Sequence, residues 1–207
     1  MTAANVTLWA LLAVIAVLIL IVVGTYNGMV RARIQVREAW SGIDVQLRRR
    51  ASFIPNLVEA VKGYAGHERE VFVEVAQARS GLQQAGGAAE AASANAQLTQ
   101  ALGRLFAVVE SYPQLRANEN FMALEKDLAD AEDKISFARQ FYNRNALDYN
   151  TRIQTFPAAL LARTAGFAPV DFFETADEGR AEVRVSFAPP SGSPPQPPDP
   201  PRPPSLT

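Results

Sequence analysis

Apolar residues run without interruption through the first part of the chain. From Val6 to Thr25 the sequence is VTLWALLAVIAVLILIVVGT, which contains no charged residue and no proline. A helix of this length spans about 30 Å, the thickness of the hydrocarbon core of a bilayer. Leu8 to Val23 is apolar on every face, whereas a surface helix of a globular protein has a polar side. The pattern predicts a transmembrane helix over residues 6–26.

A cleaved secretory signal is the alternative for this segment. Such a signal needs a basic region at its start, a shorter apolar stretch and a cleavage site of small residues. The first residues, MTAANVT, contain no Lys or Arg, which favours an uncleaved anchor. Gly24 and Gly28 form a G-x-x-x-G, a spacing that lets two membrane helices approach closely. Because only Gly24 lies in the apolar stretch, we expect these glycines to mark the membrane interface.

The pattern continues after the anchor as an amphipathic helix. Its apolar residues recur at intervals of three and four, at Val36, Trp40, Ile43 and Leu47. Pro55 is predicted to bend or interrupt this helix, since proline has no N–H and disfavours helix at the preceding residue. A second periodic stretch is expected to stay helical from Leu57 to about Leu82, with Gly63 and Gly66 as weak points.

The segment between Gln83 and Ala96 changes to Ala, Gly, Ser, Asn and Gln with a single Glu90. It is predicted to be a flexible linker or loop that adds little to a core. A helical pattern resumes from Gln97 to Ser111, and Pro113 marks its end. Asn118 or Asn120 is then available to cap the next helix.

The helix that follows has the clearest pattern in the chain. Spacings of three and four alternate through Phe121, Leu124, Leu128, Ala131, Ile135, Ala138, Tyr142, Asn145 and Tyr149. Asn145 is the polar exception in this heptad pattern and is expected to fix the register. Pro157 ends the helix, and Ala158 to Ala165 is predicted to form one more short helix closed by Gly166.

The end of the chain has little to bury. AEVRVSF, residues 181–187, alternates apolar and polar residues and predicts a short strand or extended segment. From Pro189 onwards proline dominates, which predicts a disordered spacer. Pro194 and Pro197 form a PxxP that composition alone explains. The predicted organisation is all-α: a short tail (1–5), a transmembrane helix (6–26), an antiparallel bundle with long helices (27–174), an extended segment (175–187) and a disordered Pro-rich tail (188–207).

Charge is nearly balanced overall, at −1, but it is unevenly placed. Arg31, Arg33 and Arg37 directly follow the anchor, and positive residues mark the cytoplasmic flank of a membrane helix. We therefore expect a single-pass protein of the inner membrane, with its N-terminus outside, its bundle in the cytoplasm and anionic lipid head groups near these arginines.

Further along the chain there is a second basic stretch, and a mostly acidic stretch follows later in the sequence. Arg48 to Arg50 lacks the aromatic interleaving of a nucleic-acid site, so lipid is again the favoured partner. Glu119 to Lys134 is mostly acidic. Its acidic side chains can pair with the arginines within one subunit or between subunits. Alternatively, the basic and the acidic side chains are simply exposed to solvent on two different helix faces.

Residues for catalysis or metal binding are scarce. Cysteine is absent and His67 is the only histidine, so a metal site would need carboxylates such as Glu59, Glu68 or Glu70 around it. None of the catalytic, phosphate-binding, dinucleotide or metal motifs with a defined spacing is present. We predict no catalytic, metal or cofactor site, no small-molecule substrate and no nucleic-acid partner.

Two Tyr-Asn pairs lie one heptad apart, at Tyr142–Asn143 and Tyr149–Asn150. They suggest a binding stripe on the long helix. The ordinary explanation is core packing in which each tyrosine hydroxyl reaches a hydrogen-bond partner, and we favour it.

Two long motifs resemble the LemA family of bacterial membrane proteins. The first is AWSGIDVQLRRRASFIPNLVEAVKGYAGHE, residues 39–68, and the second is SYPQLRANENFMALEKDLADAEDKISFARQFYNRNALDYNTRIQTFP, residues 111–157. Ser52 and Phe53 depart from the family pattern, and the proline tail is not part of it. The resemblance implies a membrane-anchored antiparallel helical bundle and supplies no reaction.

Three hypotheses for function follow. The first is a non-catalytic, membrane-tethered scaffold or adaptor with protein partners or self-association. The second is a membrane-bound hydrolase built on Glu59, His67 and Glu70, which only proximity in sequence supports. The third is a signalling input module that hinges at Pro55 and Gly63, although these residues more simply end and restart helices.

Overall fold

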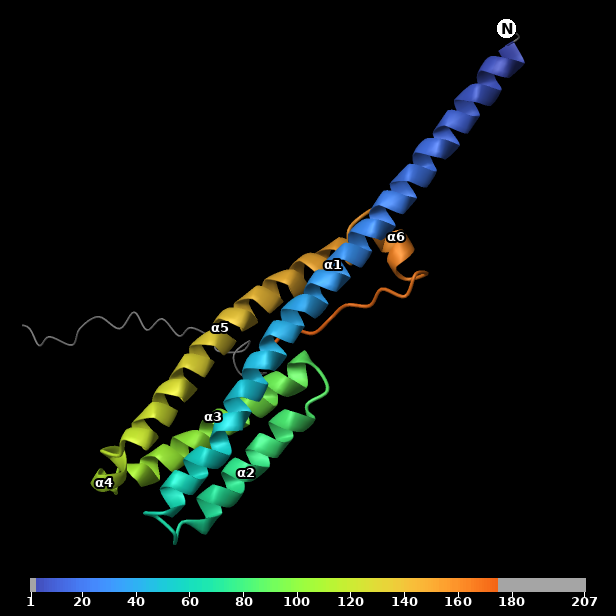
Figure 1. Cartoon of the computed structure of the whole chain (residues 1–207). Coiled ribbons are helices and arrows are strands. Elements are labelled where there is room, and N and C mark those ends of the chain that lie inside the picture. Colours follow the sequence, from blue (N-terminus) through green and yellow to red (C-terminus); the bar gives the residue numbers. More distant parts are fainter. Residues whose placement is uncertain (1–2, 175–207) are drawn as a thin grey trace, which may run out of the picture.

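The computed structural model describes residues 3–174 of the chain (Figure 1). Two long helices, α1 and α5, dominate it. The elements are α1 (Ala3–Lys62), α2 (Arg69–Gln84), α3 (Ala88–Val109), α4 (Pro113–Arg116), α5 (Glu119–Gln154) and α6 (Ala158–Ala162). No strand occurs within residues 3–174, so the all-α prediction is confirmed. The predicted extended segment and proline tail, residues 175–207, lie outside the described residues.

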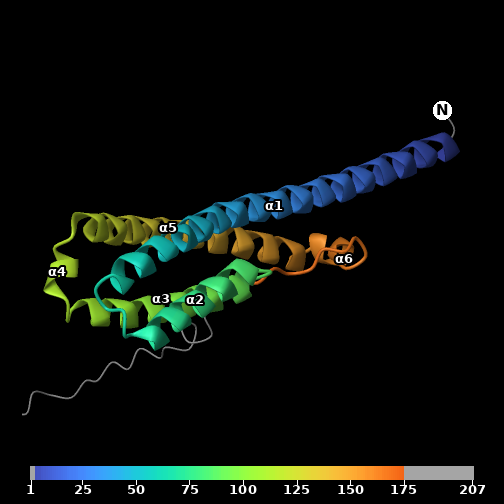
Figure 2. The ribbon, with the colours of Figure 1, turned by 60° about the horizontal axis from the view of Figure 1, so that its bottom comes forward.

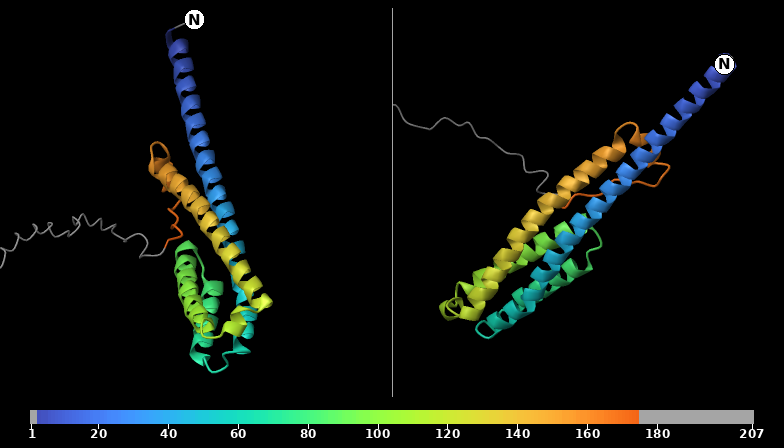
Figure 3. Two further views of the ribbon diagram at one scale, coloured as in Figure 1. Left: turned by 90° about the vertical axis from the view of Figure 1, so that its left-hand side faces the viewer. Right: turned by 45° about the horizontal axis from the view of Figure 1, so that its top comes forward.

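The helices pack as two antiparallel pairs. α5 runs back along α1 and makes the largest interface in the molecule, while α2 and α3 form a hairpin against the far end of α1. Figure 2 shows α4 crossing from the end of α3 to the start of α5. In Figure 3 the bundle occupies one end of a long rod, and the N-terminal part of α1 extends from it alone.

α1 has two parts that differ in burial. An 18-residue window near its start has a mean hydropathy of 3.2 and none of it is buried, which fits the predicted membrane span. Met29 is the first fully buried residue, and from there one face is buried at intervals of three and four to Val61. The same unbroken helix therefore carries an exposed apolar segment and the central element of the bundle core.

Pro55 lies inside α1 and does not interrupt it, so of the two predicted effects, a bend or an interruption, the interruption is wrong. Proline has no N–H, which leaves the carbonyl of Ala51 without its helical donor. The Nε of Arg79 on α2 donates a hydrogen bond to that carbonyl at 3.0 Å. The tertiary contact thus satisfies the group that would otherwise destabilise the helix.

The helix predicted from Leu57 to Leu82 is also wrong as one element. Its first turns belong to α1, the chain turns over Gly63–Glu68, and α2 begins at Arg69. The glycines named as weak points, Gly63 and Gly66, both lie in this turn. Their low helix propensity accounts for the break.

The linker predicted over residues 83–96 is mostly helix. α3 begins at Ala88, and Ala91, Ala92, Ala94 and Asn95 are buried. Alanine is the best helix former, and its small side chain lets neighbouring helices approach closely. The side chain of Glu90 also accepts a hydrogen bond from the N–H of Gly86 at 2.9 Å. The small residues that suggested a linker instead allow α3 to pack closely against its neighbouring helices.

The ends and the register of α5 follow side-chain detail. Asn118, not Asn120, is the N-cap, and its side chain accepts from the N–H groups of Asn120 and Phe121. The buried heptad position near the end is Ala146, which is 0% exposed. Asn145 lies beside it and donates to the carbonyl of Phe141 within the helix, so the expected register role of Asn145 is wrong.

The short helix α6 ends in a turn centred on Gly166. Gly166 has a φ of 73°, in the left-handed region, and the N–H of Phe167 donates to the carbonyl of Ala162 at 2.9 Å. This bond is typical of the Schellman motif, for which glycine is the favoured residue. α6 ends at Ala162 and not at the predicted Ala165, but the prediction that Gly166 forms the closing turn is confirmed. The turn directs Phe167 back toward α1, where its ring meets that of Tyr26.

We predict that Arg79 is coupled energetically to Pro55. Replacing Arg79→Met leaves the Ala51 carbonyl unpaired and lowers the free energy of unfolding of the detergent-solubilised chain by about 1–2 kcal/mol. In a Pro55→Ala background the restored N–H takes over that carbonyl, so the same replacement costs less. Denaturant titration of the four variants gives the coupling. Arg69→Met, on the same helix, is the matched control and is expected to change little; additive effects of Arg79→Met and Pro55→Ala would contradict the assignment.

Candidate functional site

A buried arginine joins three helices in the bundle. Arg50 of α1 is 5% exposed and donates hydrogen bonds to Asn95 Oδ1 and, at 3.0 Å, to Thr99 Oγ1 of α3. Its Nη1 lies 2.8 Å from a carboxylate oxygen of Glu132 on α5. Because these partners come from two other helices, the guanidinium fixes how the α2–α3 hairpin sits on the α1–α5 pair.

Burying the charged guanidinium of Arg50 costs free energy of solvation. Burial lowers the pKa of the Arg50 guanidinium below its usual value, and attraction to Glu132 acts in the opposite direction. Removing one partner would leave a buried charge uncompensated, which is strongly destabilising. The network borders a cavity of about 230 Å³ that is also lined by Arg139 and Phe173. This polar network therefore helps to determine how α1, α3 and α5 pack together. It also lies close to Phe173, in the segment that follows α6.

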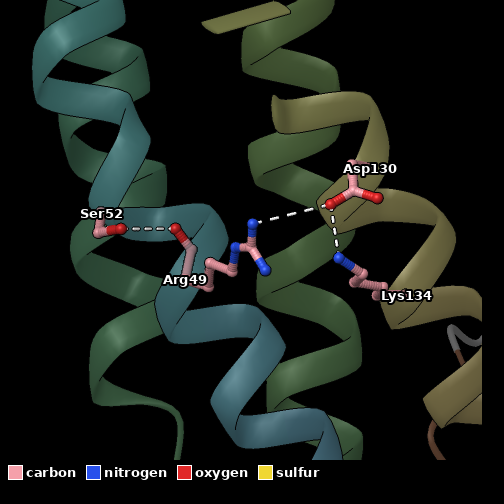
Figure 4. A network of polar contacts seen from close by, with 4 residues as sticks. All are labelled: Arg49, Ser52, Asp130 and Lys134. Carbon is pink, nitrogen blue, oxygen red and sulfur yellow. Dashed lines mark hydrogen bonds and ion pairs between the residues drawn. The ribbon is translucent and has the colours of Figure 1, made fainter. Parts of the chain in front are cut away.

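The other two arginines of the basic run also make contacts within the chain. Arg48 pairs with Asp44 one turn earlier on α1, at 2.8 Å. Figure 4 shows Arg49 reaching across from α1 to Asp130 on α5, at 3.7 Å, where Lys134 also binds the carboxylate at 2.6 Å. The hydrogen bond from Lys134 is the main reason that the pKa of Asp130 lies below its ordinary value. Of the alternatives left open by the sequence, pairing within one subunit is thus observed for Arg49 and Arg50.

The residues of the hydrolase hypothesis lie at the opposite end of the bundle from the anchor. Glu59 is in the last turns of α1, His67 in the turn that follows and Glu70 in the first turn of α2, and all three side chains are exposed. Within residues 3–174 no group of three or more such side chains is placed to hold a metal ion. The described residues thus provide no metal-ligand cluster to support this hypothesis.

The two asparagines of the Tyr-Asn pairs bind the chain's own C-terminal segment, defined as residues 167–174, which follows α6. The side chain of Asn150 exchanges two hydrogen bonds with the backbone of Val170, both at 2.9 Å. Asn143 does the same with Phe173, accepting from its N–H at 2.8 Å and donating to its carbonyl at 3.3 Å. Each amide thus pairs with a backbone as a neighbouring β-strand would.

The tyrosines extend this ladder. The hydroxyl of Tyr149 donates to the carbonyl of Ala168 at 2.9 Å, and that of Tyr142 donates to the carbonyl of Asp171 at 2.8 Å. Burial is the main cause that raises the pKa of both tyrosines above the ordinary value. The prediction that each buried hydroxyl reaches a partner is confirmed, and in the structure the suggested binding stripe is occupied by residues 168–173.

The spacing of the ladder has a simple geometric basis. Seven residues of α-helix rise about 10.5 Å, and three residues of extended chain rise about 10 Å. Side chains one heptad apart on α5 therefore meet backbone groups three residues apart on the segment, which runs antiparallel to α5. The ladder places Phe173 against Trp40 of α1, with ring centroids 6.4 Å apart.

A partly apolar groove lies between α1 and α5 on the outer face. It has a volume of about 550 Å³ and is lined by Glu38, Gly42, Gln46, Asp133, Lys134, Phe137 and Phe141, among others. The side chain of Phe137 is 76% exposed and that of Phe141 is 52% exposed. This pair was missed at the level of sequence, although two phenylalanines four residues apart and outside the heptad pattern are a visible signal. Exposed aromatic side chains on one helix face are typical of contact surfaces.

Comparison with known proteins identifies relatives over most of the chain. The model of the LemA family matches residues 39–187. Magnetosome protein MamQ of Magnetospirillum gryphiswaldense is 27% identical over 184 residues, which cover 76% of this chain and 68% of that protein. MamQ 2 of Paramagnetospirillum magneticum has the same identity and coverage. Protein LemA of Metamycoplasma hominis is 24% identical over 173 residues, covering 83% of this chain and 79% of that protein. None of these names states a reaction.

We predict that Asn150 holds the C-terminal segment against α5. Replacing Asn150→Ala removes two hydrogen bonds and leaves the Val170 backbone unpaired, at a cost of about 1–3 kcal/mol. Hydrogen exchange at the Val170 amide should accelerate by roughly tenfold or more. Asn145→Ala is the matched control, because that side chain bonds within α5 and should leave Val170 unchanged. Equal exchange in the two variants would contradict the ladder.

Proposed function

This chain belongs to the LemA family, and from that premise we propose that it is a non-catalytic, membrane-anchored helical scaffold that recruits protein partners at the bilayer. The observation that carries the proposal is the construction of α1. One helix of 60 residues is apolar and exposed at its start and forms the buried centre of the bundle from Met29 onwards. The family and the relatives fit a membrane-associated protein, and their names indicate no enzyme.

An unbroken helix suits a scaffold because it fixes where the bundle stands. No loop separates the apolar segment of α1 from the packed segment, so the two move as one body except for helix bending. Surfaces of the bundle are then presented at a constant height above the membrane.

The outer groove is the surface that we propose for recruitment. Phe137 and Phe141 lie one turn apart along one wall, and Gly42 on the other wall leaves room, since a Cβ added there meets nothing within 4 Å. Asp133 and Lys134 provide charges of both signs at the groove. A groove with this mixture suits the apolar face of a helix from a partner protein, whose side chains at i and i+4 match one turn of α5.

The basic flank of the anchor supports a cytoplasmic bundle in the inner membrane. Arg31 and Arg37 are exposed and Arg33 is half-buried, directly after the apolar segment. Positive residues within this distance of a membrane helix favour the cytoplasmic side, where they also meet anionic lipid head groups. The N-terminus is then outside.

We predict that filling the groove weakens partner capture. A photo-crosslinking phenylalanine analogue at position 137 is expected to trap a helix of another protein in intact cells at native expression. Gly42→Leu fills the groove and should reduce that product about tenfold, equivalent to about 1.4 kcal/mol of binding.

Gly103→Leu is the matched control for this experiment. Gly103 is also an exposed glycine inside a helix, with nothing within 4 Å of an added Cβ, so both variants gain similar helix propensity. Equal capture in the two variants, or no product at all, would count against the groove. A product containing only two copies of this chain would replace recruitment of a different protein with self-association.

We predict the topology to be N-terminus outside. Since the chain has no cysteine, Ser93→Cys on an exposed position of α3 gives one reactive thiol. A membrane-impermeant maleimide should label it only after spheroplasts are lysed. Thr2→Cys, on the other side of the anchor, should label before lysis. The reverse pattern would place the bundle in the cell envelope outside the membrane.

A further inference from the structure

The α5–α6 turn, defined as residues 155–162 and including the short helix α6, exposes apolar side chains at the end of the bundle nearest the anchor. Phe156 is 83% exposed, the highest value for a large apolar side chain among the described residues, and Leu160 is 70% exposed. Figure 3 shows this turn as the part of the bundle closest to the projecting segment of α1. Exposed apolar side chains grouped on one surface are typical of contact sites with proteins or membranes.

Contacts between the helices set the height of this turn along α1. A Cβ added to Gly28 would lie 3.5 Å from Nη1 of Arg152, so the end of α5 lies beside the end of the apolar segment. The rings of Tyr26 and Phe167 also meet, with centroids 5.7 Å apart. The position of the turn relative to the anchor is therefore held from both of its flanks.

The direction of the chain then brings Phe156 toward the apolar run. α5 runs antiparallel to α1 and ends at Gln154, two residues before Phe156. The chain after Arg152 therefore continues from beside Gly28 toward the apolar run that ends at Thr25. If that run fills the hydrocarbon core of a bilayer, Phe156 lies near its boundary with the head groups.

The charges around the turn match this position. Arg31 of α1, Arg152 of α5 and Arg163 after α6 are all exposed. Arg152 pairs with Asp148 at 3.3 Å. Basic side chains beside apolar ones are typical of surfaces that lie at the interface of a membrane with anionic lipids.

We propose that the α5–α6 turn is a second membrane contact of this protein, in which Phe156 and Leu160 enter the interfacial layer of the bilayer that α1 crosses. The basic side chains of Arg31 and Arg163 then face lipid head groups. This inference rests on the proposed anchoring of α1. A single membrane helix can tilt and rotate about its axis, whereas two contacts fix the orientation of the bundle and thereby the direction in which its outer groove faces.

Depth-dependent fluorescence quenching tests this contact on the full chain. Single-cysteine variants carry an environment-sensitive fluorophore in vesicles of zwitterionic and anionic phospholipid, with quenchers at known depths on the acyl chains. The test positions are Phe156→Cys and Leu160→Cys. Ile15→Cys in the apolar segment reports on the anchor, and Val73→Cys, also an exposed apolar residue at 54% but on α2, is the matched control. All four positions are exposed, so the replacements leave the core intact.

The outcomes separate the two proposals. We expect strong quenching at position 15, quenching by the shallow quencher at positions 156 and 160, and none at position 73. Quenching at position 15 with positions 156 and 160 as water-exposed as position 73 would overturn the second contact and leave the anchor standing. Absence of quenching at position 15 would overturn the anchor and, with it, this inference.

Discussion

The antiparallel packing of α5 along α1 is the interaction on which the rest of the molecule depends. It is the largest interface in the structure, and it is formed by one buried face of each helix, on which aliphatic residues alternate with Phe121, Tyr142 and Tyr149 of α5. The α2–α3 hairpin attaches to one end of this pair, and α6 with the segment over residues 167–174 attaches to the other. Loss of the α1–α5 interface would therefore detach α5, and the segment that α5 holds, from the helix that carries the anchor.

Polar contacts decide where the other elements attach to this pair. Arg50 links α1 to both α3 and α5, and Arg79 of α2 binds the carbonyl that Pro55 leaves unpaired. At the other end, Asn143 and Asn150 hold an extended segment in register. Apolar packing alone is not directional, whereas each of these groups has few satisfactory partners. The polar contacts thus select one arrangement among those that would bury a similar apolar area.

The sequence predicted the features that depend on local pattern. The apolar anchor, the long α5, an asparagine cap at Asn118 or Asn120 and the buried tyrosine hydroxyls all follow from periodicity or from the chemistry of a single side chain. Pro55 was misjudged because its compensating partner, Arg79, lies on another helix. The alanine-rich start of α3 was misjudged because small residues are common in linkers, and the sequence does not show that another helix packs closely against them. Phe137 and Phe156 were missed because periodicity identifies what is buried and does not identify apolar residues that remain exposed.

We infer that one rigid helix is both the membrane anchor and the centre of the bundle. Spin labels at Leu8→Cys and Val45→Cys, both exposed, allow a direct test. Pulsed electron paramagnetic resonance measures the distance between the two labels for the chain in lipid nanodiscs. These positions are 37 residues apart, so a continuous helix predicts a narrow distance distribution centred at about 55 Å. A broad distribution, or one centred well below this value, would mean that α1 breaks between the membrane and the bundle and would contradict the account.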